Sequence, residues 1–294
     1  MDQAASVFST KHSALHVDFV PSLSVTPVSF PTTTPPLTIL IAQTFVTSEK
    51  KITGPIHYNL RVAECSLAAV YLNALTNPPG TVLESDASPL GVSLRAFGAS
   101  RGGDPAALEE LVKKTLTKEE GYTREEIASA LKITVEELEA RFTSKFPVRA
   151  ERFKLRQRAL HVFSEARRVS SFMALLTSPP SSAPGEDLNV ALGNLLNETQ
   201  ESCRDVYECS SPEIDAICNI ARKAGAYGSR LTGAGWGGST VHLVAADKVE
   251  DVKAALKREY YDGIGVTGEK LEVAMVVSKP GSGSCLVPMS EFQA

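Results

Sequence analysis

The chain has 294 residues and a mass of 31.4 kDa, which is the size of one large domain or two ordinary ones. With 43% apolar and 22% charged residues, its composition is that of a protein with a buried core and excludes a disordered chain. The formal net charge of -4 argues against a nucleic-acid binder, and no apolar run reaches the roughly 18 residues of a membrane span. Because the N-terminus also lacks the features of a signal peptide, we expect a cytoplasmic protein.

The five cysteines and five histidines form no pattern typical of a metal site or a disulfide framework. No two cysteines have the two-residue spacing of a zinc knuckle or a redox motif, and HExxH does not occur. We therefore expect buried or half-buried thiols in a reducing compartment, and we assign no metal ligand.

The first 36 residues carry few charges and many prolines, serines and threonines. Ala14–Phe19 alternates between apolar and polar residues as a half-buried strand does, and the prolines that follow predict short edge strands or an extended linker. Leu37–Ile41 is a short, continuously apolar run, which predicts a buried strand. We place a domain boundary near Pro35 and Pro36, between residues 1–34 and residues 35–294.

The middle of the chain carries several signals for helix starts. Apolar spacing predicts a helix over Tyr58–Leu75, and Asp104 followed by Pro105 is typical of the first residues of a helix that we extend to Leu116. Two capping boxes follow, at residues 123–126 and 134–137, and with the preceding helix they make a helical insertion around 104–148. Further helices are predicted over 149–176, 187–207 and 212–224, with a loop at 178–185.

Charge is distributed unevenly over these helices. Residues 104–139 hold ten acidic and five basic side chains, whereas residues 141–168 hold two acidic and nine basic ones. The basic segment could be an RNA-binding patch or a solvated helix face that pairs with the acidic helices. We favour the helix face, because no glycine is interleaved with the bases and acidic helices precede them in the chain.

In the last third, a glycine loop at 233–238 leads into a predicted strand, Ser239–Ala245, and then a helix at 248–260 and a strand at 271–277, an α+β pattern. The loop matches G-x-G-x-x-G, but a dinucleotide-binding fold needs a strand before this motif and a helix after it. We expect the reverse order here and reject that function. The HRD and DFG motifs of protein kinases are also missing. With both of these functions rejected, two interpretations of the glycines remain. Their N–H groups could surround an anion, or the missing side chains could allow close packing of another backbone segment.

Ser229–Leu243 resembles the third conserved motif of the GHMP sugar kinases, the family of galactokinase, homoserine kinase, mevalonate kinase and phosphomevalonate kinase. Further segments narrow the resemblance to galactokinases of fungal type and run nearly from end to end: residues 1–19, 57–61, 157–165 and 197–215. The resemblance implies the GHMP-kinase C-terminal fold, a ferredoxin-like layered antiparallel sheet with helices, carrying a helical elaboration. It also implies ATP-dependent phosphorylation of galactose at its anomeric hydroxyl, with Mg²⁺.

The resemblance assigns roles to six residues. Asp2 corresponds to the catalytic aspartate, which orients the sugar hydroxyl and takes its proton. Tyr58 corresponds to a tyrosine that contacts the sugar. The glycines of the loop correspond to positions near the nucleotide phosphates: Gly233, Gly235, Gly237 and Gly238.

Two earlier motifs of the family do not occur in this sequence: the galactose-binding segment and the Gly/Ser-rich loop that wraps the ATP phosphates. An arginine that assists phosphoryl transfer is missing as well. We therefore expect an N-terminally truncated galactokinase in which residues 1–34 are a remnant of the N-terminal domain, and we expect this chain alone to be inactive.

Two other functions remain open. The chain could belong to a galactose- and ATP-sensing co-inducer that binds a transcriptional repressor, a role that some fungal relatives of galactokinase have. It could also belong to an N-acetylgalactosamine kinase, since the resemblance implies that most residues that select the sugar lie upstream of this chain.

Overall fold

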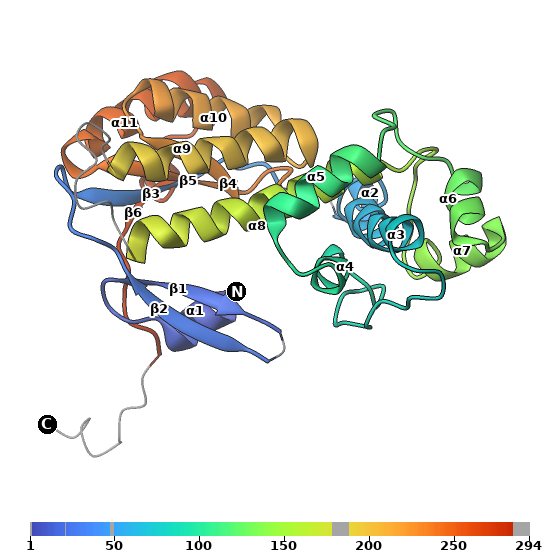
Figure 1. The fold of residues 1–294 in the computed structure, drawn as a ribbon. Coiled ribbons are helices and arrows are strands. Elements are labelled where there is room, and N and C mark those ends of the chain that lie inside the picture. The colour runs from blue at the N-terminus through green and yellow to red at the C-terminus, as the bar shows by residue number, and fades with distance from the viewer. Residues whose placement is uncertain (1, 21, 48–49, 178–187, 285–294) are drawn as a thin grey trace, which may run out of the picture.

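The structure is a computed structural model that describes residues 2–20, 22–47, 50–177 and 188–284. Two lobes are connected by one long helix, α8 (Leu155–Thr177) (Figure 1). We call residues 37–43 and 188–278 the sheet lobe, and residues 58–163 the helical lobe. The predicted loop at 178–185 lies outside the described residues.

A four-stranded antiparallel sheet with the order β4-β5-β3-β6 forms the centre of the sheet lobe. Side chains of β3 alternate in burial, and Leu40 pairs with His242 of β5 on one side and with Val277 of β6 on the other. This order, with helices after the first and third strands of the sheet, is the ferredoxin-like arrangement, so the expected α+β fold class is confirmed. The strands are β3 (Leu37–Gln43), β4 (Gly228–Thr232), β5 (Ser239–Ala245) and β6 (Met275–Ser278).

Two layers of helices cover this sheet. Leu40, Ala42 and Val244 face α10 and α11 in one core, whereas Leu243 on the opposite face packs with apolar residues of α8 and α9. The predicted helix start at Ser211 is confirmed, because its side chain caps α10. The helices are α9 (Leu188–Glu201), which continues as a π-helical segment (Ser202–Val206), α10 (Pro212–Lys223), α11 (Val249–Leu256) with a second π-helical segment (Lys257–Tyr261), and the short α12 (Glu269–Glu272).

The last strand begins later than the sequence predicted. Residues 269–272 form α12, and the ladder with β3 begins only at Met275, so the prediction of a strand from Leu271 is wrong. The run Leu271–Val277 is apolar enough for either structure, and pairing with β3 decides which residues become strand.

The helical lobe has its own core, in which Phe97, Phe142 and Phe153 are fully buried. Both capping boxes are present: Thr123 and Thr134 accept hydrogen bonds from the third residue of their helices, whose carboxylates bond back. Asp104 caps the helix before them. The helices of this lobe before α8 are α3 (Tyr58–Thr76), α4 (Leu94–Ser100), α5 (Pro105–Thr115), α6 (Arg124–Leu131) and α7 (Val135–Phe142), and the short α2 (Lys50–Thr53) precedes the lobe in the chain.

The basic residues of α8 pair with the helices that precede it in the chain. Arg167 bonds Glu109 at 2.8 Å, and Arg156 donates to the backbone carbonyls of Lys113 and Leu116. These contacts support the expected pairing with the acidic helices. The expected solvated face is wrong for Arg158 and Arg168, which are buried. Among the described helices, none is both long and apolar enough to cross a bilayer.

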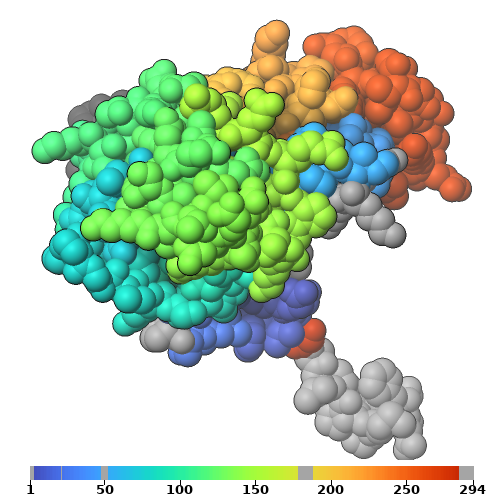
Figure 2. Space-filling model, turned by 90° about the vertical axis from the view of Figure 1, so that its right-hand side faces the viewer, coloured from blue at the N-terminus to red at the C-terminus, as the bar shows by residue number. Residues whose placement is uncertain are grey.

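The N-terminal segment forms a short helix and a two-stranded antiparallel sheet against the middle of the molecule (Figure 1). Val28 packs with Leu176 of α8 and Leu243 of β5. Figure 2 shows this blue hairpin directly below the continuous surface of the helical lobe. The boundary at residues 34 and 35 stays a prediction. The elements are α1 (Asp2–Phe8), β1 (Ser13–Asp18) and β2 (Ser24–Ser29).

Candidate functional site at the junction of the lobes

The glycine loop at 233–238 connects two neighbouring strands. It joins β4 to β5, which are antiparallel partners from Gly228↔Leu243 to Thr232↔Ser239. The expected order, with a helix directly before the loop, is therefore wrong. A strand still follows the loop in place of a helix, so the rejection of a dinucleotide-binding motif is unchanged.

Two of the loop glycines allow close approach of other backbone segments. A Cβ atom on Gly235 would lie 2.0 Å from the carbonyl oxygen of Cys209, and one on Gly237 would lie 2.6 Å from that of Val46. Both residues also have φ values in the left-handed region, +87° and +131°. The neighbouring N–H groups of Trp236 and Gly238 donate to the same two carbonyls. The loop is thus fastened to two segments that are distant in sequence.

Trp236 attaches the loop to the helical lobe. Its ring stacks on His57 with centroids 4.8 Å apart and planes 5° apart, and the Arg61 guanidinium lies 5.7 Å from the tryptophan ring centroid. Partial burial and the charge of Arg61 lower the pKa of His57, which favours the neutral ring. This stack fixes the start of α3, where Tyr58 is the first residue.

Tyr58 lies at the rim of a cavity of about 320 Å³ between the two lobes, which we call the junction cavity. Its side chain is 55% exposed, so the ring and hydroxyl are accessible to a ligand. Gly233 lines the same cavity, and the structure therefore brings together two of the features that the sequence singled out. The other lining residues come from α3, α8, the segment 203–209 and β4.

A charged pair on the wall of the junction cavity was missed by the sequence analysis as a functional candidate. Arg230 of β4 bonds Glu165 of α8 at 2.9 Å. Burial alone would raise the pKa of Glu165, but Arg230, a hydrogen bond from Thr199 and Arg168 together lower it, so the carboxylate stays ionised. Glu165 is the last residue of the segment 157–165, and Arg230 lies in the segment 229–243, both of which resemble the family. Their positions in these segments could have identified the two residues as functional candidates.

Behind the junction cavity lies a buried ionic cluster. Glu64 and Arg158 are each 1% exposed and bond at 2.6 Å, and Arg61 contacts the same carboxylate at 3.2 Å. Glu208 forms ion pairs with the same two arginines and a third ion pair with Lys154. Arg61 also donates to the backbone carbonyls of Tyr207 and Glu208. The cluster holds the segment before Cys209 in place, and through it the glycine loop.

A second cavity, of about 540 Å³, lies on the other side of the glycine loop. It is lined by the loop and by residues 43–47. The N–H groups of Gly233, Ala234 and Gly235 have no hydrogen-bond partner among the described residues. Several unpaired N–H groups around one space form a suitable environment for an anion such as a phosphate.

Asp2 is the first residue of α1, and its side chain lies outside the described part of the structure. The helix contacts β1, and residues at its end bond the segment near Gly283. No described residue of α1 lines the junction cavity or the cavity beside the glycine loop. The catalytic assignment of Asp2 therefore stays a prediction, as do those of Tyr58 and the glycines.

The part of the chain that the structure describes holds no large cluster of metal-binding side chains. No group of three or more His, Cys, Asp or Glu side chains there is placed to hold a metal ion. We therefore assign no step of the chemistry to a metal held by this chain.

The family model and the related proteins that match this chain belong to the GHMP kinases or galactokinases. The family model of the GHMP kinase C-terminal region matches residues 186–262. The chain is 41% identical to the galactokinase of Saccharomyces cerevisiae over 97% of its own length and 59% of that protein, and 36% identical to the galactokinase of Schizosaccharomyces pombe over 99% of its length and 60% of that protein. The chain thus spans about three fifths of the relatives that it matches.

A solved structure also shares the fold. The galactokinase of Lactococcus lactis, crystallised with galactose, superposes on 96% of this chain and 54% of its own, with a TM-score of 0.59 and 22% identity. This likeness supports the fold assignment.

Proposed function

We propose that this chain belongs to the GHMP kinase family and serves the ATP-dependent phosphorylation of galactose at its anomeric hydroxyl in the cytoplasm. The observation that carries the proposal is its relationship to galactokinases over nearly its whole length. The junction cavity adds support, because it places the accessible side chain of Tyr58 beside the glycine loop.

In the proposed reaction, the anomeric oxygen forms a bond to the γ-phosphorus of ATP while the bond from that phosphorus to ADP breaks. The carboxylate of Asp2 orients the hydroxyl and receives its proton. Tyr58 hydrogen-bonds the sugar, and the backbone N–H groups of Gly233 and Gly235 stabilise phosphate oxygens. We assign Mg²⁺ to the nucleotide and to residues outside the described structure.

The test is a chimera in which this chain replaces the matching segment of the Saccharomyces galactokinase. We expect the chimera to phosphorylate galactose, and Asp2→Asn to reduce kcat by about 10² to 10⁴ because general-base catalysis is lost. Tyr58→Phe should raise KM for galactose with a smaller change in kcat. Glu110→Gln, at an exposed site on α5, is the matched control and should leave both constants unchanged.

A folded chimera without turnover would show that the proposed activity is wrong. Comparing kcat/KM for galactose and N-acetylgalactosamine identifies the acceptor. Binding of both ligands without phosphate transfer, together with capture of a transcriptional repressor, would favour the co-inducer role. We expect no measurable turnover from the 294-residue chain alone, because it contains no Gly/Ser-rich phosphate loop.

A further inference from the structure

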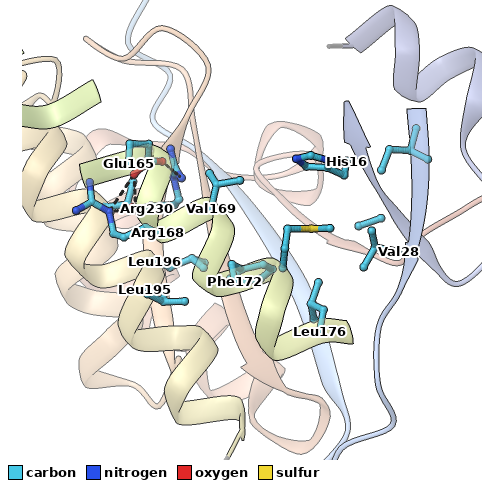
Figure 3. Close-up of a pocket in the computed structure, with 14 residues that line it drawn as sticks. His16, Val28, Glu165, Arg168, Val169, Phe172, Leu176, Leu195, Leu196 and Arg230 are labelled. Carbon is cyan, nitrogen blue, oxygen red and sulfur yellow. Dashed lines mark hydrogen bonds and ion pairs between the residues drawn. The ribbon is translucent and has the colours of Figure 1, made fainter. Parts of the chain in front are cut away.

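A third cavity, of about 250 Å³, lies between the N-terminal hairpin and the helices α8 and α9 (Figure 3). We call it the hairpin cavity. Its apolar wall is formed along one side of α8, with further residues from α9 and from both strands of the hairpin: Val169, Phe172, Met173, Leu176, Leu195, Leu196, Leu15 and Val28. The proposed reaction uses no residue of this wall.

One end of the hairpin cavity is charged. Glu165, Arg168 and Arg230 lie together there, at the far end from Val28 and His16 of the hairpin (Figure 3). Among the described lining residues of this end, two arginines face one carboxylate, which is an excess of one positive charge. His16, the other titratable residue of the lining, pairs with Asp18 on its own strand.

Arg168 has unused hydrogen-bonding capacity. Its side chain is 7% exposed, and its Nε donates to Glu165 and to Thr199. Its Nη2 is buried and has no hydrogen-bond partner among the described residues. An unpaired buried donor costs about 1 to 3 kcal/mol, and a carboxylate is the acceptor that fits a guanidinium best.

We propose that the hairpin cavity binds a monocarboxylate with an apolar tail. The carboxylate would bond Arg230, whose side chain is 33% exposed, while Arg168 adds its charge at the same end of the cavity. The tail would lie along the α8 wall between Val169 and Leu176. The cavity volume of about 250 Å³ suits a tail of medium length. Binding combines burial of the tail with neutralisation of the excess positive charge.

Such a ligand would also contact the wall of the junction cavity. Glu165 and Arg230 line both cavities, so the same ion pair separates the two spaces. A carboxylate that bonds Arg230 competes with Glu165 for it. Occupancy of the hairpin cavity therefore changes the charge distribution beside Tyr58.

The first test is calorimetric titration of the 294-residue protein with sodium octanoate, without sugar or nucleotide. We expect saturable binding of octanoate, and binding of octylammonium, which has the same tail and the opposite charge, at least about tenfold weaker. Equal affinities, or no saturation by octanoate, would contradict the proposal. The outcome is independent of galactokinase activity.

The second test locates the ligand. Ala14→Phe adds bulk on the hairpin side of the cavity and should weaken octanoate binding at least about tenfold, whereas Ala99→Phe makes the same change at an exposed site on α4. A second measurement does not depend on the folding of Ala14→Phe. The wild-type protein is labelled at its methionine methyl groups and followed by NMR spectroscopy. Octanoate should then shift the resonance of Met173 and leave that of Met275, in the sheet core, unchanged. An unshifted Met173 would place any binding elsewhere.

Discussion

The two lobes bury polar side chains in different ways. In the helical lobe, the carboxylate of Glu64 is shared by Arg158 and Arg61, so full charges are kept out of water by pairing. In the sheet lobe, His242 is completely buried between two hydroxyls, Thr240 and Ser229, each 2.8 Å from a ring nitrogen. Removing one member of a buried ion pair destabilises the fold, because the other charge is left buried without a partner. Protonating a buried imidazole destabilises the fold as well, because it places a new charge away from water. Variants and pH should therefore affect the two lobes differently.

The largest effect is expected from removing the shared charge of the helical lobe. Glu64→Gln keeps the side-chain volume but leaves Arg158 and Arg61 without their buried carboxylate. We expect the free energy of unfolding to fall by about 3 to 5 kcal/mol, measured by urea denaturation. Glu110→Gln, which breaks the exposed pair with Lys113, should cost less than about 1 kcal/mol. Equal losses in both variants would contradict a special role for burial.

The connection between the lobes is tested at the glycine loop. Gly235→Ala forces a Cβ atom against the carbonyl of Cys209 and strains a left-handed backbone, whereas Gly233→Ala at φ +80° meets no atom within 4 Å. The second variant should cost about 1 to 2 kcal/mol from the backbone alone. The first should cost clearly more, because the clash adds to the strain. Thermal unfolding of the two variants measures the difference, and equal melting temperatures would argue against close packing at Gly235.

The buried histidine of the sheet lobe predicts a pH dependence. Burial lowers the pKa of His242 to about 3, below its ordinary value of 6.5. The unfolded chain then binds more protons than the folded one between these values, so the stabilisation is complete above pH 6.5 and is lost as the pH falls toward 3. The contribution of His242 to the slope should reach about 1.4 kcal/mol per pH unit.

Urea denaturation at pH 7, 6 and 5 measures this slope. His242→Asn should reduce it. Part of the slope should remain in this variant, because burial also lowers the pKa of His161, to about 4. An unchanged slope in His242→Asn would show that this histidine is not the titrating group.

The smallest effect is expected at the surface of the helical lobe. Thr123→Ala removes the oxygen that accepts from the N–H of Glu126 in the first capping box. The expected loss is about 1 kcal/mol, with Thr134→Ala as the matched variant in the second box. Urea denaturation of both variants should give similar losses, and a much larger loss in one would indicate a tertiary role for that threonine.

The sequence predicted the elements whose signals are local. The starts of α5, α6 and α7 follow from Asp104, Thr123 and Thr134, because a cap is a contact within a few residues of the chain. The strand over residues 239–245 was predicted correctly from its apolar run.

Elements and sites that depend on distant partners were harder to predict. The strand β4 is short, contains the charged Arg230 and exists because it pairs with β5. The ion pairs Glu64–Arg158 and Glu165–Arg230 join residues 94 and 65 positions apart, and no local pattern predicts them. The site residues Tyr58 and Gly233 were identified by resemblance, and the structure explains their proximity through the stack of His57 on Trp236.

That stack also gives the molecule a built-in optical probe. Trp236 is the one tryptophan of the chain, and its indole contacts both the imidazole of His57 and the guanidinium of Arg61, where the two lobes meet. Its fluorescence therefore arises from a single place in the structure. Separation of the lobes would be visible as a change in emission before either core unfolds, without any label attached to the protein.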